Sequence, residues 1–240
     1  SQKVNQARMG LYMGLFNLAF VLADLLGKEM VDPLSRGLYP GYSRLGSDRA
    51  RLAGVFAEVL NACAALLLPA GVGLALVASD FVTVVLGQQW QGSVPFIRWL
   101  ALAGALGGIN YLMSMHILIA AGHEARAAVT AWLRLGLYLP AVIAAGKVGG
   151  GMLAIAQVSF CFELLFLPVS MLVLVRSLPV TLRQLAASLS RPLLATVVML
   201  LAVSGVHGLG VEAAPLRLSL AIGIGVLSYA GSLLIIWRLA

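Results

Sequence analysis

The amino-acid sequence predicts an all-α fold, a polytopic bundle of about seven transmembrane helices. Composition is the first observation: 61% of the residues are hydrophobic and 10% are charged, whereas soluble domains are nearer half apolar and a quarter charged. The second observation is that the apolar residues gather in runs of about 20, which is the length that crosses roughly 30 Å of hydrocarbon. A soluble core of this size does not bury so much apolar surface.

The apolar runs follow one another along the chain, and the connections between them are short. The longest connection, Asp32–Arg51, contains the turn-forming pair Pro40-Gly41, and the polar stretch Gly87–Pro95 predicts a loop on the opposite side. The predicted spans are approximately Met9–Val31, Gly54–Ala78, Phe96–Ala120, Ala127–Ala145, Gly150–Val175, Leu189–His207 and Arg217–Trp237.

The basic residues predict the orientation of the chain, because lysine and arginine concentrate in cytoplasmic loops. One set of loops and ends carries Arg36, Arg44, Arg49, Arg51, Arg126, Arg176, Arg183, Arg191 and Arg238. The other carries Lys3, Arg8, Lys147 and Arg217, with Arg98 near its surface. The first, richer side is predicted to be cytoplasmic, with the C-terminus inside and the N-terminus outside. The net charge of +7 therefore reflects topology, and we expect no nucleic-acid partner.

Polar residues in the first span share one helix face. Asn17, Asp24 and Lys28 recur at i, i+7 and i+11. A polar group in hydrocarbon is unfavourable, so such a face indicates either the wall of an aqueous cavity or a structural Asp24–Lys28 pair with Lys28 reaching the surface.

Deeper polar residues occur in later spans. Arg134 and Tyr138 form a stripe on the fourth span, Arg98 and Asn110 lie on the third, and Glu163 is near the midpoint of the fifth. Arg98, Asn110, Arg134 and Tyr138 are candidates for a substrate cavity, although Asn110 also suits an interhelical hydrogen bond. A carboxyl group at the depth of Glu163 must be paired, protonated or hydrated. Glu163 is thus either a proton or cation site, with Asp24 as a second candidate, or the partner of Arg134.

Motifs of enzymes and cofactor sites are absent from the sequence. There is no GxxxxGK[ST], HExxH or GxSxG, and His116, His123 and His207 are not spaced as metal ligands. Cys63 and Cys161 lie singly in apolar runs, which is typical of buried small hydrophobes. We therefore expect a protein that is not an enzyme and that holds no cofactor or metal.

Three segments resemble the polysaccharide flippases of the MOP exporter superfamily, the Wzx-like translocases of lipid-linked oligosaccharides. Residues 10–26 (GLYMGLFNLAFVLADLL) are similar to that family's Gly-x-Tyr-x-x-Ala helix opening, with Phe16 near the usual tyrosine. Residues 33–52 resemble its Pro-x-Ser-x-x-x-x-Pro-x-x-Ser-x-Leu connection. Residues 69–90 resemble a helix that begins with proline and ends in Leu-x-Gly-x-x-Trp.

The resemblance implies an architecture larger than this chain. Family members have about fourteen helices, in two six-helix lobes around a central cavity followed by two extra helices. This chain would hold helices eight to fourteen, as a C-terminal portion. Residues 1–178 would supply five helices of the second lobe, and residues 179–240 the two accessory helices. Ser1 in place of Met, and an external N-terminus without a signal, agree with this expectation. A missing N-terminal lobe or another copy would complete the cavity.

The resemblance also implies a function. The substrate would be a polyprenyl-diphosphate-linked oligosaccharide for cell-surface polysaccharide such as lipopolysaccharide O-antigen, moved across the bacterial inner membrane. Lys28, Arg134 and Arg98 suit a diphosphate, because cations offset its charge away from water. One alternative is a multidrug/cation antiporter of the same superfamily. A membrane glycan polymerase or acyltransferase, or a structural membrane subunit, are further alternatives.

Overall fold

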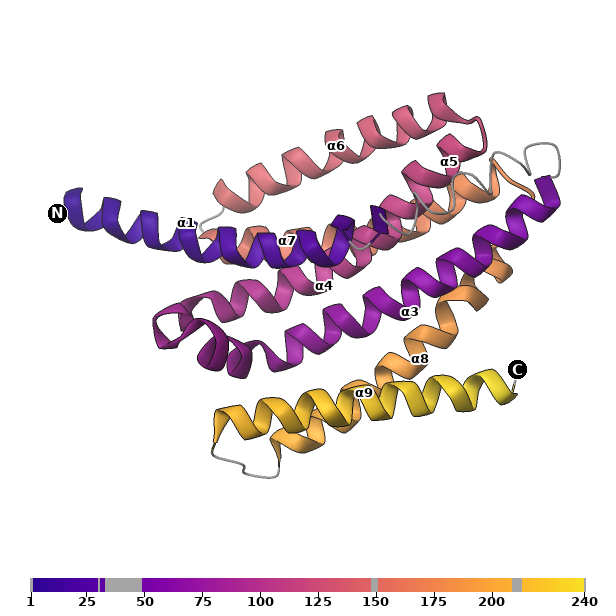
Figure 1. Cartoon of the computed structure of the whole chain (residues 1–240). Helices are drawn as coiled ribbons and strands as arrows, with labels where there is room; N and C mark the ends of the chain where they lie inside the picture. Colours follow the sequence, from indigo (N-terminus) through magenta and orange to yellow (C-terminus); the bar gives the residue numbers. More distant parts are fainter. Residues whose placement is uncertain (1, 30, 33–48, 148–150, 209–212, 240) are drawn as a thin grey trace.

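The computed structural model describes residues 2–29, 31–32, 49–147, 151–208 and 213–239. Nearly all of these residues are helical, which confirms the predicted all-α bundle. Figure 1 shows long helices running roughly side by side, with α1 beginning at one end of the bundle and α9 ending at the other.

The helices follow the predicted apolar runs closely. The first half of the chain contains α1 (Gln2–Asp24), η1 (Leu25–Glu29), α3 (Arg49–Phe81), η2 (Val82–Leu86), η3 (Gln88–Ser93), α4 (Val94–Tyr111), η4 (Leu112–His116) and α5 (Ile117–Ala120). The second half contains α6 (Glu124–Lys147), α7 (Gly151–Val175), α8 (Leu182–His207) and α9 (Ala214–Leu239). The segments η1, η2 and η4 are π-helical turns, and η3 is a 3₁₀-helix.

Six helices among the described residues are long and apolar enough to cross a membrane, and Met13–Asp24 is a shorter apolar helix. The first predicted span, Met9–Val31, is thus α1 with its π-helical extension η1. The connection between the first two spans, with its predicted turn at Pro40-Gly41, lies largely outside the described residues.

Two predicted boundaries need correction. Helix α8 begins at Leu182, not Leu189, because Thr181 and Gln184 form a capping box that starts the helix before its apolar part. The predicted loop Gly87–Pro95 is mostly the 3₁₀-helix η3, and Pro95 already lies in the first turn of α4, where its fixed φ suits a helix start.

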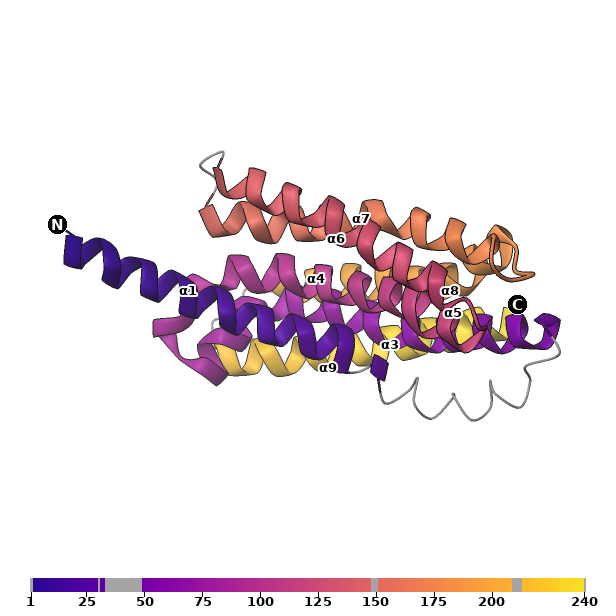
Figure 2. The same cartoon turned by 90° about the horizontal axis from the view of Figure 1, so that it is seen from above.

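Helix α4 is central to the packing. It contacts α1, α3 and α7, while α6 packs on α7, and α8 and α9 pack on α3. Figure 2 shows α6 and α7 as a layer on one side of α4, with α1 on the other. The long described helices therefore place residues of α4, α6 and α7 in one region, and residues of α3, α4, α8 and α9 in another.

Glycines allow α4 to approach α1 and η1 closely. A Cβ at Gly108 would lie 2.8 Å from the backbone oxygen of Gly27, and a Cβ at Gly27 would lie 3.0 Å from the oxygen of Gly104. Only residues without a side chain permit this backbone contact. The Gly104/Gly108 pair thus brings the backbones of α4 and η1 together near the middle of the bundle.

Candidate functional site

A polar cluster formed by Asn110, Arg134 and Glu163 lies where α4, α6 and α7 meet. Glu163 stands half-way along α7, and its side chain is 10% exposed. Its carboxylate pairs with the guanidinium of Arg134 on α6. Asn110 on α4 donates from Nδ2 to Glu163 Oε2 and to the Glu163 backbone oxygen, at 2.9 Å each. Three helices therefore meet at one buried carboxylate.

The pairing resolves how a carboxyl group is tolerated at this depth. A charged carboxylate in an apolar interior is unfavourable unless a counter-charge and hydrogen bonds accompany it. Arg134 provides the counter-charge, and Asn110 provides hydrogen bonds. Asn110 is itself fully buried, and its Oδ1 accepts no hydrogen bond from the part of the chain that the structure describes.

Aromatic side chains surround the same cluster. The guanidinium of Arg134 lies over the ring of Phe166, 5.8 Å from its centroid, and Phe166 stacks with Phe162 at 5.5 Å. Tyr138, one turn from Arg134, reaches Ser159 of α7 at 2.9 Å. Since Ser159 Oγ donates to the backbone of Ile155, the tyrosine hydroxyl is the donor. The aromatic rings thus flank a cation held at mid-depth.

Arg134 is the most accessible member of the polar cluster. Its side chain is 29% exposed, whereas Glu163 is 10% exposed. One face of the guanidinium is therefore engaged by the carboxylate and the aromatic ring, and the rest is open. A guanidinium with free N–H groups binds a phosphate in a bidentate manner. The arrangement suits the binding of an anionic group without leaving an uncompensated charge when that group is absent.

The other predicted site residues are not brought to this cluster. Asn17 is exposed on α1, and Asp24 is half-buried on the same helix. The side chain of Lys28, and with it the predicted Asp24–Lys28 pair, lies outside what the structure describes. Arg98 lies two-thirds of α4 away from Asn110, near the start of that helix. The residues predicted to line a substrate cavity are therefore distributed over separate regions of the bundle, and their roles in binding stay predictions.

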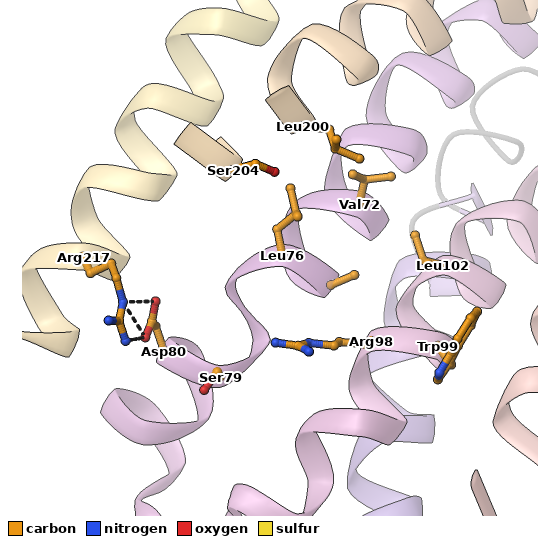
Figure 3. A pocket seen from close by; sticks show the side chains of 11 residues that line it. Val72, Leu76, Ser79, Asp80, Arg98, Trp99, Leu102, Leu200, Ser204 and Arg217 are labelled. Carbon is orange, nitrogen blue, oxygen red and sulfur yellow. Dashed lines mark hydrogen bonds and ion pairs between the residues drawn. The ribbon is translucent and has the colours of Figure 1, made fainter. Parts of the chain in front are cut away.

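Arg98 faces a separate hollow, here named the lateral cavity, between α3, α4, α8 and α9. Its volume is about 840 Å³. Figure 3 shows the side chain of Arg98 extending from α4 toward the end of α3 that carries Ser79 and Asp80. The lining residues are Val72, Ala75, Leu76, Ser79, Asp80, Arg98, Trp99, Leu102, Leu200, Ser204 and Arg217.

An ion pair that the sequence did not predict closes one edge of the lateral cavity. Asp80 on α3 is 2% exposed, and it accepts hydrogen bonds from Arg217 on α9. The Arg217 Nε atom lies 3.0 Å from Oδ1 and 2.9 Å from Oδ2, and Nη2 also contacts Oδ1. The last two helices contribute Leu200, Ser204 and Arg217 to the wall of this cavity.

Two features of the sequence pointed to this pair. Asp80 is a carboxylate at the end of a long apolar run, and Arg217 is the basic residue that opens the last span. The sequence does not predict their contact, because 137 positions separate the two residues. For metals, the described helices contain no group of three or more His, Cys, Asp or Glu residues arranged to hold an ion.

Comparison with known proteins shows what the chain resembles. Residues 5–95, which include α1 and α3, match the family described as "Polysaccharide biosynthesis protein". A Klebsiella pneumoniae protein named "Uncharacterized membrane protein in cps region" is 33% identical over 40% of this chain. The lipopolysaccharide biosynthesis protein WzxC of Escherichia coli (strain K12) is 23% identical over 57% of the chain. The chain therefore resembles membrane proteins of polysaccharide biosynthesis, Wzx-like proteins among them.

A further relative of this Wzx-like protein extends over the polar cluster. The teichuronic acid biosynthesis protein TuaB of Bacillus subtilis (strain 168) is 25% identical over 90% of the chain. The matched regions are 20%, 28% and 45% of the three relatives' own lengths, so the Wzx-like chain spans less than half of each of them. No solved structure matches it. With its membrane-length helices, the Wzx-like chain is a multi-pass bacterial membrane protein.

Proposed function

We propose that the Wzx-like chain is the C-terminal part of a flippase that moves a polyprenyl-diphosphate-linked oligosaccharide from the cytoplasmic to the outer leaflet of the inner membrane. The observation that carries this proposal is the partly exposed guanidinium of Arg134 at mid-depth, paired with Glu163. A diphosphate crossing the membrane needs a cation at that depth, because its charge is otherwise uncompensated. The protein acts as a transporter and catalyses no covalent step.

The pair supports a mechanism by exchange of anions. With the cavity empty, Glu163 neutralises Arg134, and Asn110 holds the carboxylate in place. When the diphosphate arrives, its oxygens take the open face of the guanidinium and weaken the bond to Glu163. Glu163 then takes up a proton or a cation, which couples transport to a gradient. The transporter returns to its resting state when the carboxylate recovers Arg134.

We infer the remaining architecture from the same proposal. Residues 1–178 form part of one transporter lobe, and residues 179–240 form the accessory pair of helices. A second lobe faces the polar cluster, and rocking of the two lobes gives alternating access. The C-terminus is cytoplasmic, which the distribution of basic residues in the sequence supports.

Glycan export in cells tests the proposal. The intact protein is expressed in a strain that lacks its own flippase for the same glycan, and surface polysaccharide is measured. We expect Arg134→Gln to reduce export by about 10- to 100-fold, because a charge-assisted hydrogen bond contributes roughly 1.5–3 kcal/mol. Arg134→Lys restores part of the loss, since lysine keeps the charge but not the bidentate geometry.

The control is Glu124→Gln, which removes an exposed carboxylate at the start of the same helix, α6. This variant is expected to export normally. If Arg134→Gln exported as well as the unchanged protein at equal abundance, Arg134 would not bind the substrate and the mechanism would be wrong.

A second candidate function is antiport of organic cations. One observation favours it: Arg134, the partner of Glu163, lies over the ring of Phe166, and a carboxylate together with aromatic rings suits an organic cation. Arg134 already occupies that position, which favours the anionic substrate. Measuring resistance to cationic drugs in the same strain separates the two functions, because only the antiporter raises the tolerated concentration.

A further inference from the structure

The lateral cavity is separate from the polar cluster and carries charge of its own. Arg98 is exposed, and among the residues that the structure describes it forms no ion pair or hydrogen bond. Asp80 and Arg217 neutralise each other at the far edge of the cavity. The three ionised groups therefore sum to one positive charge, and the guanidinium of Arg98 is the group that is left to bind an anion.

The lining changes from polar to apolar along the cavity. Ser79, Asp80 and Arg98 lie at the end of the bundle where α3 finishes and α4 starts. Val72 and Leu76 continue the lining along α3, with Leu102 and Leu200 opposite. Since a helix rises 1.5 Å per residue, Asp80 lies about 12 Å along α3 from Val72, close to the roughly 15 Å of one hydrocarbon leaflet.

Position and size agree with a lipid. Trp99 lines the polar end, and tryptophan favours the headgroup region of a membrane. The volume of about 840 Å³ lies within the roughly 300–1,000 Å³ typical of small-molecule sites. A free phosphate would use only the polar end and would leave the apolar wall without a partner.

We propose that the lateral cavity binds one anionic phospholipid of the bilayer, with its phosphate on Arg98 and an acyl chain along Val72 and Leu76. The Asp80–Arg217 pair fixes the edge against which the headgroup rests. The lipid fills the hollow that α3, α4, α8 and α9 line together. This inference rests on the cavity alone and does not depend on which substrate the protein transports.

Native mass spectrometry tests the inference on the intact protein in nanodiscs that contain phosphatidylglycerol. After mild release, the unchanged protein retains one phosphatidylglycerol molecule. Arg98→Gln lowers the retained fraction by about fivefold, the effect of one basic residue near an anionic surface. A matched control, Arg183→Gln, removes an exposed arginine from α8 that does not line the cavity, and it retains the lipid.

A second variant changes the shape of the lateral cavity and leaves its charges unchanged. Leu76→Trp fills the apolar part of the cavity, and it also lowers retention. Three results would each overturn the proposal. The first is that Arg98→Gln retains as much lipid as the unchanged protein, and the second is that Arg183→Gln loses as much lipid as Arg98→Gln. The third is that inorganic phosphate alone displaces the lipid. Displacement by an equimolar polyprenyl diphosphate would assign the cavity to the substrate and would likewise overturn a bilayer-lipid site.

Discussion

Gly108 of α4 and Gly27 of η1 touch through their backbones: a Cβ at position 108 would lie 2.8 Å from the Gly27 oxygen. The obstacle is backbone, which cannot rotate away as a side chain can. We predict that Gly108→Ala lowers the free energy of unfolding by about 1–3 kcal/mol, the usual effect of overpacking. Thermal unfolding in detergent measures it.

Gly136→Ala is the matched control for this prediction. Gly136 is also helical, on α6, but a Cβ there would have no neighbour within 4 Å. Because alanine favours a helix over glycine by up to about 1 kcal/mol, this variant is expected to be unchanged or slightly stabilised. Equal midpoints for the two variants would show that α4 and η1 are not in close contact.

Arg134 and Glu163 are predicted to be energetically coupled. Removing either charge leaves the other without its partner, so Arg134→Gln and Glu163→Gln each destabilise the protein. The double variant is expected to lose less than the sum of the single variants, by about 0.5–3 kcal/mol. A double-mutant cycle on unfolding free energies measures this coupling, and strict additivity would contradict the pair.

Tyr138→Phe separates stability from transport. The variant loses the hydroxyl bond to Ser159 and keeps the ring next to Phe162. Interhelical hydrogen bonds in membrane proteins contribute about 0.6 kcal/mol on average, so only a small drop in stability is expected. If Tyr138 contacts the substrate, glycan export falls by more than protein abundance does. Export that follows abundance would exclude Tyr138 from the substrate site.

Asp80→Leu and Arg217→Leu are each predicted to destabilise the protein, because each removes one member of the ion pair. The loss is expected to be smaller for Asp80→Leu, since the remaining Arg217 side chain is 30% exposed and water can solvate its charge. The double variant Asp80→Leu/Arg217→Leu is expected to be more stable than either single variant. A double variant that is the least stable of the three would contradict the ion pair.

The orientation of the chain is testable by cysteine labelling in a Cys63→Ala/Cys161→Ala background. Gln88 and Arg238 are both exposed; Gln88 opens η3 between α3 and α4, and Arg238 is in the last turn of α9. With the C-terminus inside, a membrane-impermeant maleimide labels the Gln88→Cys variant in intact cells. It labels the Arg238→Cys variant only after permeabilisation. The reverse pattern would invert the predicted topology.

Membrane thickness explains why the sequence predicts the helices so well. An apolar run must match the hydrocarbon core, so α7 at Gly151–Val175 differs by one residue from its predicted start at Gly150. The start of α8 was missed because its first turns are polar and are fixed by the Thr181–Gln184 capping box. The length of an apolar run does not reveal whether the helix continues beyond the membrane core.

Depth in the membrane predicts which polar residues matter, but not which of them meet. Glu163 and Arg134 were identified because ionised groups at mid-span are unfavourable, and their pairing was one of two open interpretations. The contact of Asn110 with Glu163 depends on how α4 is rotated, and close packing of residues such as Gly108 sets that rotation. Asp80 and Arg217 were missed because residues near a membrane surface need no partner to be explained.

The contact between Asp80 and Arg217 has a consequence for synthesis of the protein. The two residues are 137 positions apart. At roughly 5–20 residues per second, the ribosome needs about 7–27 s after Asp80 to produce Arg217. During that interval Arg217 is not yet available to the carboxylate of Asp80. Because a charge in hydrocarbon is unfavourable, we expect α3 to stay near the translocon or the aqueous surface until then. The synthesis of α9 then supplies Arg217 and fixes α3 in place, so the position of α3 in the membrane is settled only after α9 has followed it.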